Sequence, residues 1–321
     1  MGLVTFRACA VLALGSAPVG LGACGDADGT VGSGDGPEIV ATTTQVADLA
    51  RNVAGHRASV AQLLQPGSDP HDYEPRPSDA RALAGAELVL RSGGDLDEWL
   101  EDIVDAAGSE AESVTLLDAV RARQEDHGGE AQDAGQADPH WWQDPRNAAA
   151  AVRRIRQALV KIDPDGRDAY TANAAAYVRT INALDRRIAG CFAAVPDSRR
   201  KLVTNHDALG PYAERYDIEV VGTVIPALST QAQASAGEVT ELVRAIRAEQ
   251  VRTIFPETSL NPKLERAIAR ESGAEVGPAL YADTLGAEGS PGATYLGSLR
   301  ANARAMVAGF TDGRRRCALR G

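Results

Sequence analysis

The 321-residue sequence has few aromatic residues, few cysteines and fewer basic than acidic side chains. Phe, Tyr and Trp make up 4% of the chain, and there are four Cys. Lys and Arg number 33 against 44 Asp and Glu, so the formal net charge of −11 argues against a basic nucleic-acid-binding protein. Apolar residues reach 44%, which is enough for a buried core, and the length suggests two globular units.

The apolar stretch near the N-terminus, residues 8–14, is shorter than the roughly 20 residues that a membrane-spanning helix needs. It follows Arg7 and ends in small residues before Cys24, which is typical of a bacterial lipoprotein signal. An ordinary secretory signal is the alternative. We predict a signal peptide over 1–23, lipid attachment at Cys24, and a flexible, glycine-rich tether over 24–36.

Two cysteines remain beyond this segment, Cys191 and Cys317. An exported chain reaches a compartment in which disulfides persist, so the two thiols are candidates for one bond. Two separate buried thiols are the alternative that the sequence leaves open.

Short β-branched and apolar segments alternate with segments of helical periodicity along most of the chain, which is typical of parallel sheets flanked by helices. The longest helical stretch, 165–195, has no internal proline, and a helix of ~30 residues spans about 45 Å. We therefore predict an α/β protein with two lobes, each with a mostly parallel sheet flanked by helices, joined by one long rigid helix. The predicted boundaries are 37–162 for the N-terminal lobe, 163–195 for the linking helix and 196–321 for the C-terminal lobe.

The expected strands cover 38–44, 58–64, 88–91, 114–117, 201–204, 219–224, 251–255 and 275–280. The expected helices cover 45–54, 78–86, 95–107, 145–161, 165–195, 208–216, 236–249, 262–273 and 294–309. The polar and acidic segment 124–136 interrupts the alternation, and we predict that it is an exposed loop.

Three of the five histidines lie in loops of similar character. His71 and His140 each follow an Asp-Pro pair, and His206 lies where an apolar strand ends and a helix begins. Because ligands bind beyond the carboxyl ends of strands in open α/β sheets, acidic residues at other strand ends are candidates to join them, namely Glu257 and Asp283. Three imidazoles and one carboxylate form a four-ligand set suited to Zn²⁺.

Polar side chains near the histidines are candidates to orient the imidazole rings through the second ring nitrogen. These candidates are Asp69, Glu74, Asn205 and Glu257. We expect Trp141 and Trp142, beside His140, to close the site off from solvent or to pack on the lobe.

Four motifs follow one another along the chain: Asp69-Pro70-His71-Asp72-Tyr73-Glu74-Pro75, Asp138-Pro139-His140, Asn205-His206-Asp207 and Phe255-Pro256-Glu257. In this combination the chain resembles the zinc/manganese substrate-binding proteins of ABC transporters over about 38–310. The resemblance implies two α/β lobes bridged by a long helix, with one metal ion held between them. It implies His71 and His140 as ligands from the first lobe and His206 and Asp283 from the second, with Glu257 as the competing carboxylate.

The function that this resemblance implies is capture of one Zn²⁺ ion outside the cytoplasmic membrane and its delivery to an ABC permease driven by an ATPase. We expect a monomer that is not an enzyme, does not bind nucleic acid and meets the membrane only through its lipid anchor. Manganese or iron in the same role is the alternative. Because manganese sites are richer in carboxylate oxygens, the histidine at position 206 favours zinc.

Two other functions fit the residues less well. A zinc-dependent hydrolase needs an open coordination position, whereas four protein ligands close the site. A surface adhesin is a further alternative for the same fold. The acidic segment 124–136 contains only one histidine, His127, so it does not predict a strong accessory metal site.

Overall fold

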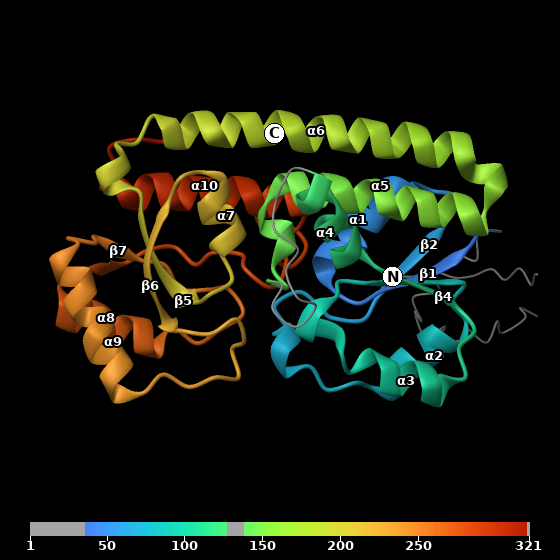
Figure 1. Cartoon of the computed structure of the whole chain (residues 1–321), viewed down its shortest axis with the longest axis horizontal. Coiled ribbons are helices and arrows are strands. Elements are labelled where there is room, and N and C mark those ends of the chain that lie inside the picture. Colours follow the sequence, from blue (N-terminus) through green and yellow to red (C-terminus); the bar gives the residue numbers. More distant parts are fainter. Residues whose placement is uncertain (1–35, 127–137, 320–321) are drawn as a thin grey trace, which may run out of the picture. The chain divides into compact units, whose positions relative to one another are not determined.

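A computed structural model of the chain describes residues 36–126 and 138–319 (Figure 1). The predicted signal peptide at 1–23, the lipidation site at Cys24, all but the last residue of the tether and most of the 124–136 segment lie outside the described residues. These predictions therefore remain predictions.

The first lobe, which precedes the long helix, contains a parallel sheet with the strand order β2-β1-β3-β4. The strands are β1 (Glu38–Ala41), β2 (Ser59–Gln62), β3 (Leu88–Arg91) and β4 (Glu112–Thr115). Successive side chains of a strand point to opposite faces, so Ile39 and Leu88 join one hydrophobic cluster while Val40 and Val89 join another. The sheet is therefore buried on both faces.

Helices cover each of these faces (Figure 1). The cluster of Ile39 and Leu88 includes residues of α1 (Thr44–Ala54) and α5 (Pro145–Ile162). The opposite cluster includes residues of α2 (Pro77–Ala84) and α3 (Leu100–Ala107). This arrangement confirms the predicted fold class for the first lobe.

The first lobe differs from the sequence prediction at two helix starts. The predicted strand 114–117 ends at Thr115, and α4 (Leu116–Asp126) follows it at once and includes the start of the predicted loop. Leu116 and Val120 are one helical turn apart and both buried in the core, which favours the helix. The predicted helix 95–107 begins only at Leu100, because Gly94–Asp97 form a 3-10 turn whose Asp97 carboxylate accepts the N–H groups of Ser92 and Gly93.

The second lobe, which follows the long helix, has two short parallel strand pairs in place of one continuous sheet. The pairs are β5 (Lys201–His206) with β6 (Glu219–Ile225), and β7 (Thr253–Ile254) with β8 (Glu275–Val276). Isolated bridges connect Thr204 with Phe255 and Glu257 with Leu280. The predicted strands 251–255 and 275–280 are both shorter than expected, and Pro278, which has no N–H to continue a ladder, follows soon after the end of β8.

The helices of the second lobe lie on both sides of these strands. They are α7 (Gly210–Arg215), α8 (Ala236–Ala248), α9 (Lys263–Ser272) and α10 (Tyr295–Phe310). Val203 packs in a cluster with residues of α8 and α9, whereas its neighbour Leu202 packs in the large cluster that includes α10. The second lobe is thus also a set of parallel strands between helical layers.

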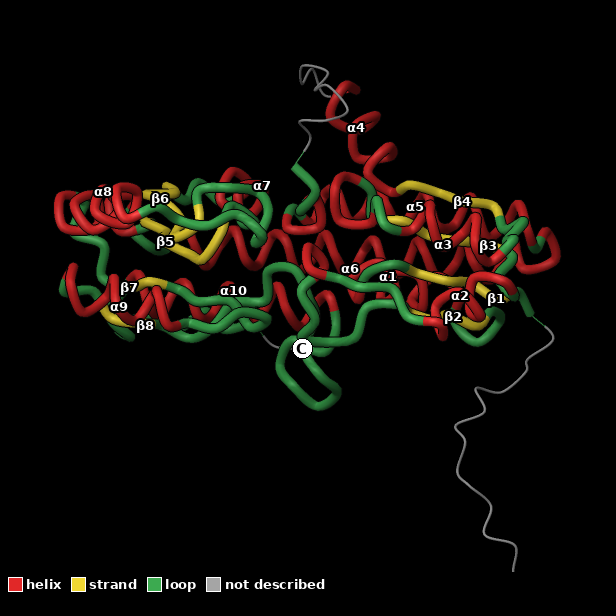
Figure 2. The backbone as a smooth tube through the Cα atoms, turned by 90° about the horizontal axis from the view of Figure 1, so that it is seen from below, coloured by secondary structure: helices red, strands yellow, loops and turns green. Residues whose placement is uncertain are grey.

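The long helix α6 (Arg167–Ala193) runs alongside both lobes (Figures 1 and 2). At 1.5 Å per residue its 27 residues extend about 40 Å. Its apolar stripe, from Tyr170 to Ile188, is buried in the same cluster as Leu90 of the first lobe and Met306 of the second. The two lobes therefore share one core along this helix.

Cys191, near the end of α6, forms a disulfide bond with Cys317. Of the two alternatives that the sequence leaves open, the structure contains the bonded one. The bond attaches the segment after α10 to the long helix. Among the described helices, none is both long and apolar enough to cross a membrane.

Candidate metal centre

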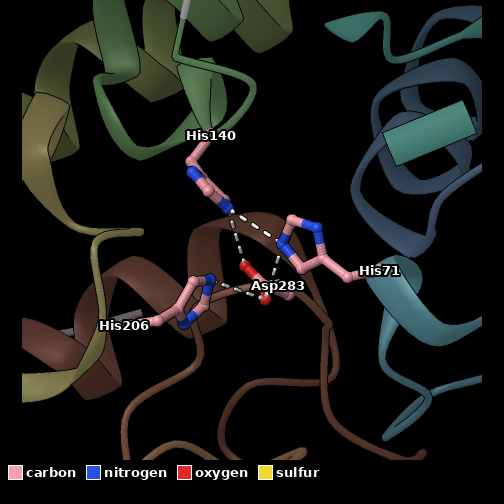
Figure 3. A group of neighbouring side chains, drawn as sticks. All are labelled: His71, His140, His206 and Asp283. Atoms are coloured by element: carbon pink, nitrogen blue, oxygen red, sulfur yellow. Dashed lines mark hydrogen bonds and ion pairs between the residues drawn. The ribbon is translucent and has the colours of Figure 1, made fainter. Parts of the chain in front are cut away.

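Four side chains converge between the two lobes: His71, His140, His206 and Asp283 (Figure 3). Each offers one potential ligand atom, and these atoms all lie within 4.8 Å of one another. The Nε2 atoms of His71, His140 and His206 lie 3.6, 3.4 and 3.2 Å from the Asp283 carboxylate. The structure thus brings together the three histidines and one of the two candidate carboxylates.

The two Asp-Pro-His motifs share one side-chain-to-backbone hydrogen bond, in different loops. In each, the aspartate side chain accepts the backbone N–H of the histidine two residues later, from His71 to Asp69 at 3.0 Å and from His140 to Asp138 at 2.9 Å. The proline between them fixes its own backbone angle and has no N–H of its own to satisfy. The aspartate of each motif thus fixes the backbone of a histidine that faces the centre.

Carboxylates orient two of the imidazole rings. The Nδ1 atom of His206 lies 2.8 Å from Glu257, and the same oxygen accepts the His206 backbone N–H at 3.1 Å. The Nδ1 atom of His140 lies 2.8 Å from Asp138. Each contact leaves Nε2 facing the common centre. Sequence reasoning missed Asp138, although its position two residues before His140, as Asp69 precedes His71, was a signal for it.

The other residues predicted to orient imidazoles have different partners. The second carboxylate oxygen of Asp69 accepts a hydrogen bond from Thr230 in the second lobe at 2.7 Å, so Asp69 reaches the backbone of His71 and not its ring. The Asn205 amide donates to the buried carboxylate of Glu265, since the side chain of Asn205 points away from that of its strand neighbour. Glu74 is exposed, and within the described residues it makes no hydrogen bond or ion pair with the four.

The two adjacent tryptophans are both buried and pack against each other with ring centroids 5.7 Å apart. Trp142 lies edge-on to the His140 ring at 5.7 Å and borders the site. Trp141 donates its indole N–H to Ser92 of the first lobe. One tryptophan therefore walls the site and the other packs on the lobe.

Charge in the site is concentrated on Asp283, which is completely buried. Burial favours the neutral acid, but the three surrounding imidazoles hold the pKa of Asp283 below its usual value. Burial lowers the pKa of His71. Burial acts in the same direction on His206, but the neighbouring carboxylates of Asp283 and Glu257 outweigh it and raise the pKa of His206 to about 10. The two carboxylates thus stabilise positive charge at His206.

Several buried polar atoms at this centre lie within ion-pair distance of one another but make no hydrogen bond of good geometry among the described residues. They are Nε2 of His206 and both carboxylate oxygens of Asp283. Buried polar atoms are normally paired, so a group of unpaired ones directed at one point indicates a ligand. Three neutral nitrogens and one carboxylate oxygen match the donors of a four-coordinate divalent metal ion.

Comparison with known proteins agrees with this geometry. Residues 39–309 match a family described as the zinc-uptake complex component A, periplasmic. The chain belongs to this family. It is accordingly an extracytoplasmic metal-binding component of an ABC transporter and not an enzyme, and the resemblance noted in the sequence is confirmed.

Relatives within the family differ in the metal that their names give. The manganese-binding lipoprotein MntA of Halalkalibacterium halodurans is 30% identical over 290 residues, covering 90% of this chain and 94% of its own length. The iron-binding protein YfeA of Yersinia pestis is 30% identical and covers 85% and 86%. The structure of the periplasmic zinc-binding protein TroA from Treponema pallidum has a TM-score of 0.79 at 27% identity, covering 86% of this chain and 99% of that one.

Proposed function

We propose that this protein captures one Zn²⁺ ion outside the cytoplasmic membrane and delivers it to an ABC permease driven by a cytoplasmic ATPase. The proposal rests on the convergence of His71, His140, His206 and Asp283 at one buried point. Three imidazole nitrogens and one carboxylate oxygen are the donors that four-coordinate zinc favours. Four protein ligands would close the site, which suits binding and release better than catalysis.

Manganese is the second candidate, because the MntA relative is named for manganese and aligns over most of both chains. Manganese favours sites richer in carboxylate oxygens. The residue that bears on the choice is His206, whose imidazole adds a third nitrogen where a glutamate would add an oxygen. The TroA neighbour, named for zinc, supports the same preference.

The proposal also assigns roles to the parts of the chain. Segments 37–162 and 196–321 are the two lobes, and 163–195 is the link between them. Lipid attachment at Cys24 and cleavage after residue 23 would leave the chain on a short tether, and the MntA relative is named a lipoprotein. We expect a monomer, with the permease and its ATPase as the partners.

Metal analysis of protein stripped with a chelator and reloaded with Zn²⁺ and Mn²⁺ in competition tests the choice of metal. We expect zinc to occupy the site at one ion per chain, and the variant His206→Glu to shift the preference toward manganese. Tighter binding of manganese by the unmodified protein would contradict the zinc assignment. Because imidazoles must lose their protons to bind a metal ion, the affinity is expected to fall as the pH decreases.

A Co²⁺-substituted sample separates transport from hydrolysis. A four-coordinate spectrum without an exchangeable water ligand supports a binding protein. An exchangeable water on the metal ion would favour the metallohydrolase instead.

A further inference from the structure

The segment that contains Asp283 lies in the second half of the chain, where Tyr281 pairs with Asn302 of α10, but around Asp283 itself it is hydrogen-bonded to the first lobe. The carbonyl oxygen of Ala282 accepts hydrogen bonds from Gln143 Nε2 at 2.8 Å and Trp142 Nε1 at 3.0 Å. The side-chain amide of Gln45 approaches the same oxygen at 3.4 Å. Donors from α1 and from the 3-10 turn before α5 therefore meet at the peptide next to Asp283.

Residues on the far side of Asp283 continue this contact. The backbone N–H of Leu285 donates to Thr44 Oγ1 at 2.9 Å. The hydroxyl of Thr284 accepts the backbone N–H of Gly67 at 3.0 Å. Asp283 is thus flanked on both sides by hydrogen bonds to the first lobe.

The hydrogen bonds to Ala282 and Leu285 are buried, which makes them costly to break. The donors Gln45, Trp142 and Gln143 are 1–2% exposed, so water cannot replace a lost partner. A buried polar group left unpaired costs about 1–3 kcal/mol. Movement of the segment away from the first lobe would leave several such groups unpaired at once.

The surroundings of His206 are different. Its backbone N–H and its Nδ1 atom both contact Glu257, and the next residue, Asp207, donates its N–H to Ala227. These partners all belong to the second lobe, and the nearest hydrogen bonds from this side to the first lobe are made by Thr230 and Gln231, on the partly exposed loop that follows Ala227. The helix that follows, α7, packs against the 3-10 turn of the first lobe, and apolar packing of this kind imposes no fixed direction.

We infer that His71, His140 and Asp283 form one rigid set of ligands attached to the first lobe, and that metal exchange proceeds by separation of His206 from this set. Gln143 is then a positioning residue, because its amide fixes the peptide of Ala282 and through it the direction of the Asp283 carboxylate. This inference rests on the proposed function. It adds that His206, and not Asp283, moves away from the histidines of the first lobe when the metal ion is exchanged.

The variant Gln143→Leu keeps the size of the side chain and removes the donor. Zinc affinity, measured in competition with a chromophoric chelator, is expected to weaken about tenfold, as for the loss of an outer-shell partner. In an Asp283→Asn background the same change should weaken binding less than about twofold, because Gln143 acts through Asp283. In a His206→Ala background the tenfold effect should persist, since independent sites add.

Asn173→Leu is a matched control. Its amide also donates to a backbone carbonyl between elements, that of Val53 at 3.1 Å, but it joins α6 to α1. We expect this control to lower the unfolding temperature without changing zinc affinity. If Gln143→Leu does not fold, Trp142→Phe takes its place in the same set of double variants, because it removes another hydrogen-bond donor to the Ala282 carbonyl oxygen.

Two results would overturn the inference: unchanged affinity of Gln143→Leu, or an equal loss in the Asp283→Asn background. A loss that disappears in the His206→Ala background would also overturn it, since Asp283 would then move with His206. Failure of the unmodified protein to bind zinc or manganese would contradict the proposed function itself.

Discussion

The two lobes differ in the β-sheets from whose ends their metal ligands extend. In the first, four strands form one continuous parallel sheet that is buried on both faces. In the second, two short pairs are connected by one isolated bridge, Thr204 with Phe255, and a second bridge, Glu257 with Leu280, extends the pair β7-β8 next to the site. Ligands at strand ends can therefore come from a lobe that has no continuous sheet. In the second lobe, which has fewer hydrogen bonds between strands, the segment around Asp283 is also hydrogen-bonded to the first lobe.

The difference extends to the carboxylates that orient the imidazoles. Glu257 of the second lobe has a completely buried side chain, whereas the Asp138 side chain in the first lobe is 29% exposed. A charge–dipole contact is stronger where water is excluded. We therefore expect the contact of Glu257 with His206 to contribute more to metal binding than the contact of Asp138 with His140.

Removal of a ligand tests the comparison most strongly. We expect His140→Ala to weaken zinc binding by more than about a thousandfold and His206→Ala by about a hundredfold, both at or above the range for outer-shell residues. The reason is that His206→Ala leaves three fixed ligands and room for water, whereas His140→Ala breaks the fixed set. Calorimetric titration with Zn²⁺ measures both affinities. A larger loss for His206→Ala would contradict the conclusion that the ligands attached to the first lobe form the fixed part of the site.

Loss of the disulfide tests what holds the second lobe to the long helix. Cys191 and Cys317 are 126 residues apart in the sequence, and removal of a bond that closes a long loop is expected to cost about 2–4 kcal/mol of unfolding free energy. Urea unfolding of Cys191→Ser, Cys317→Ser and the double variant measures the loss, which should be the same in all three. Zinc affinity should stay within about twofold of the unmodified protein, and a large change would mean that the bond positions ligands.

Paired substitution of the orienting carboxylates compares the lobes directly. Glu257→Gln is expected to weaken zinc binding about tenfold, and Asp138→Asn about threefold, because solvent already screens the exposed side chain. Chelator competition measures both under identical conditions. Equal losses would show that burial does not set the strength of these contacts.

The smallest effect concerns an ion pair that joins Arg57 of the first lobe to Asp163, just before the long helix. Hydrogen bonds from Arg57 at 2.6 Å and from the Tyr170 hydroxyl at 2.7 Å lower the pKa of Asp163 to about 2. Because the folded-state pKa lies below the unfolded value of about 3.9, the stabilisation is present above pH 4 and is lost as the pH falls toward 2. The Arg57 side chain is 42% exposed, so solvent screening keeps the effect small.

Urea unfolding of the unmodified protein and of Asp163→Asn between pH 2 and pH 6 measures this contribution. The difference in stability between the two should shrink as the pH decreases. A difference that is independent of pH would assign the role to packing by Tyr170 instead of the carboxylate charge.

Local patterns in the sequence predicted much of the fold, because each depends on neighbouring residues. The apolar stripe of α6 and the alternation of Ile39 and Val40 could be predicted from spacing alone. The prediction was wrong where distant contacts decide. Because Leu116 and Val120 are buried against the core, α4 includes residues 116–117, which the sequence predicted as strand, and 124–126, which it predicted as loop.

The sequence by itself determined the local turns at His71 and His140, since in each the aspartate two residues earlier accepts the histidine N–H, and it placed His206 at the end of a strand. Only the tertiary structure decided between the two carboxylates, placing Asp283 among the imidazoles and Glu257 behind His206. It alone shows that the Asp283 segment is bound by Gln143, which lies 139 residues from Ala282 in sequence. Such contacts depend on how helices and strands that are distant in the sequence pack together, and this packing cannot be predicted from a local sequence pattern.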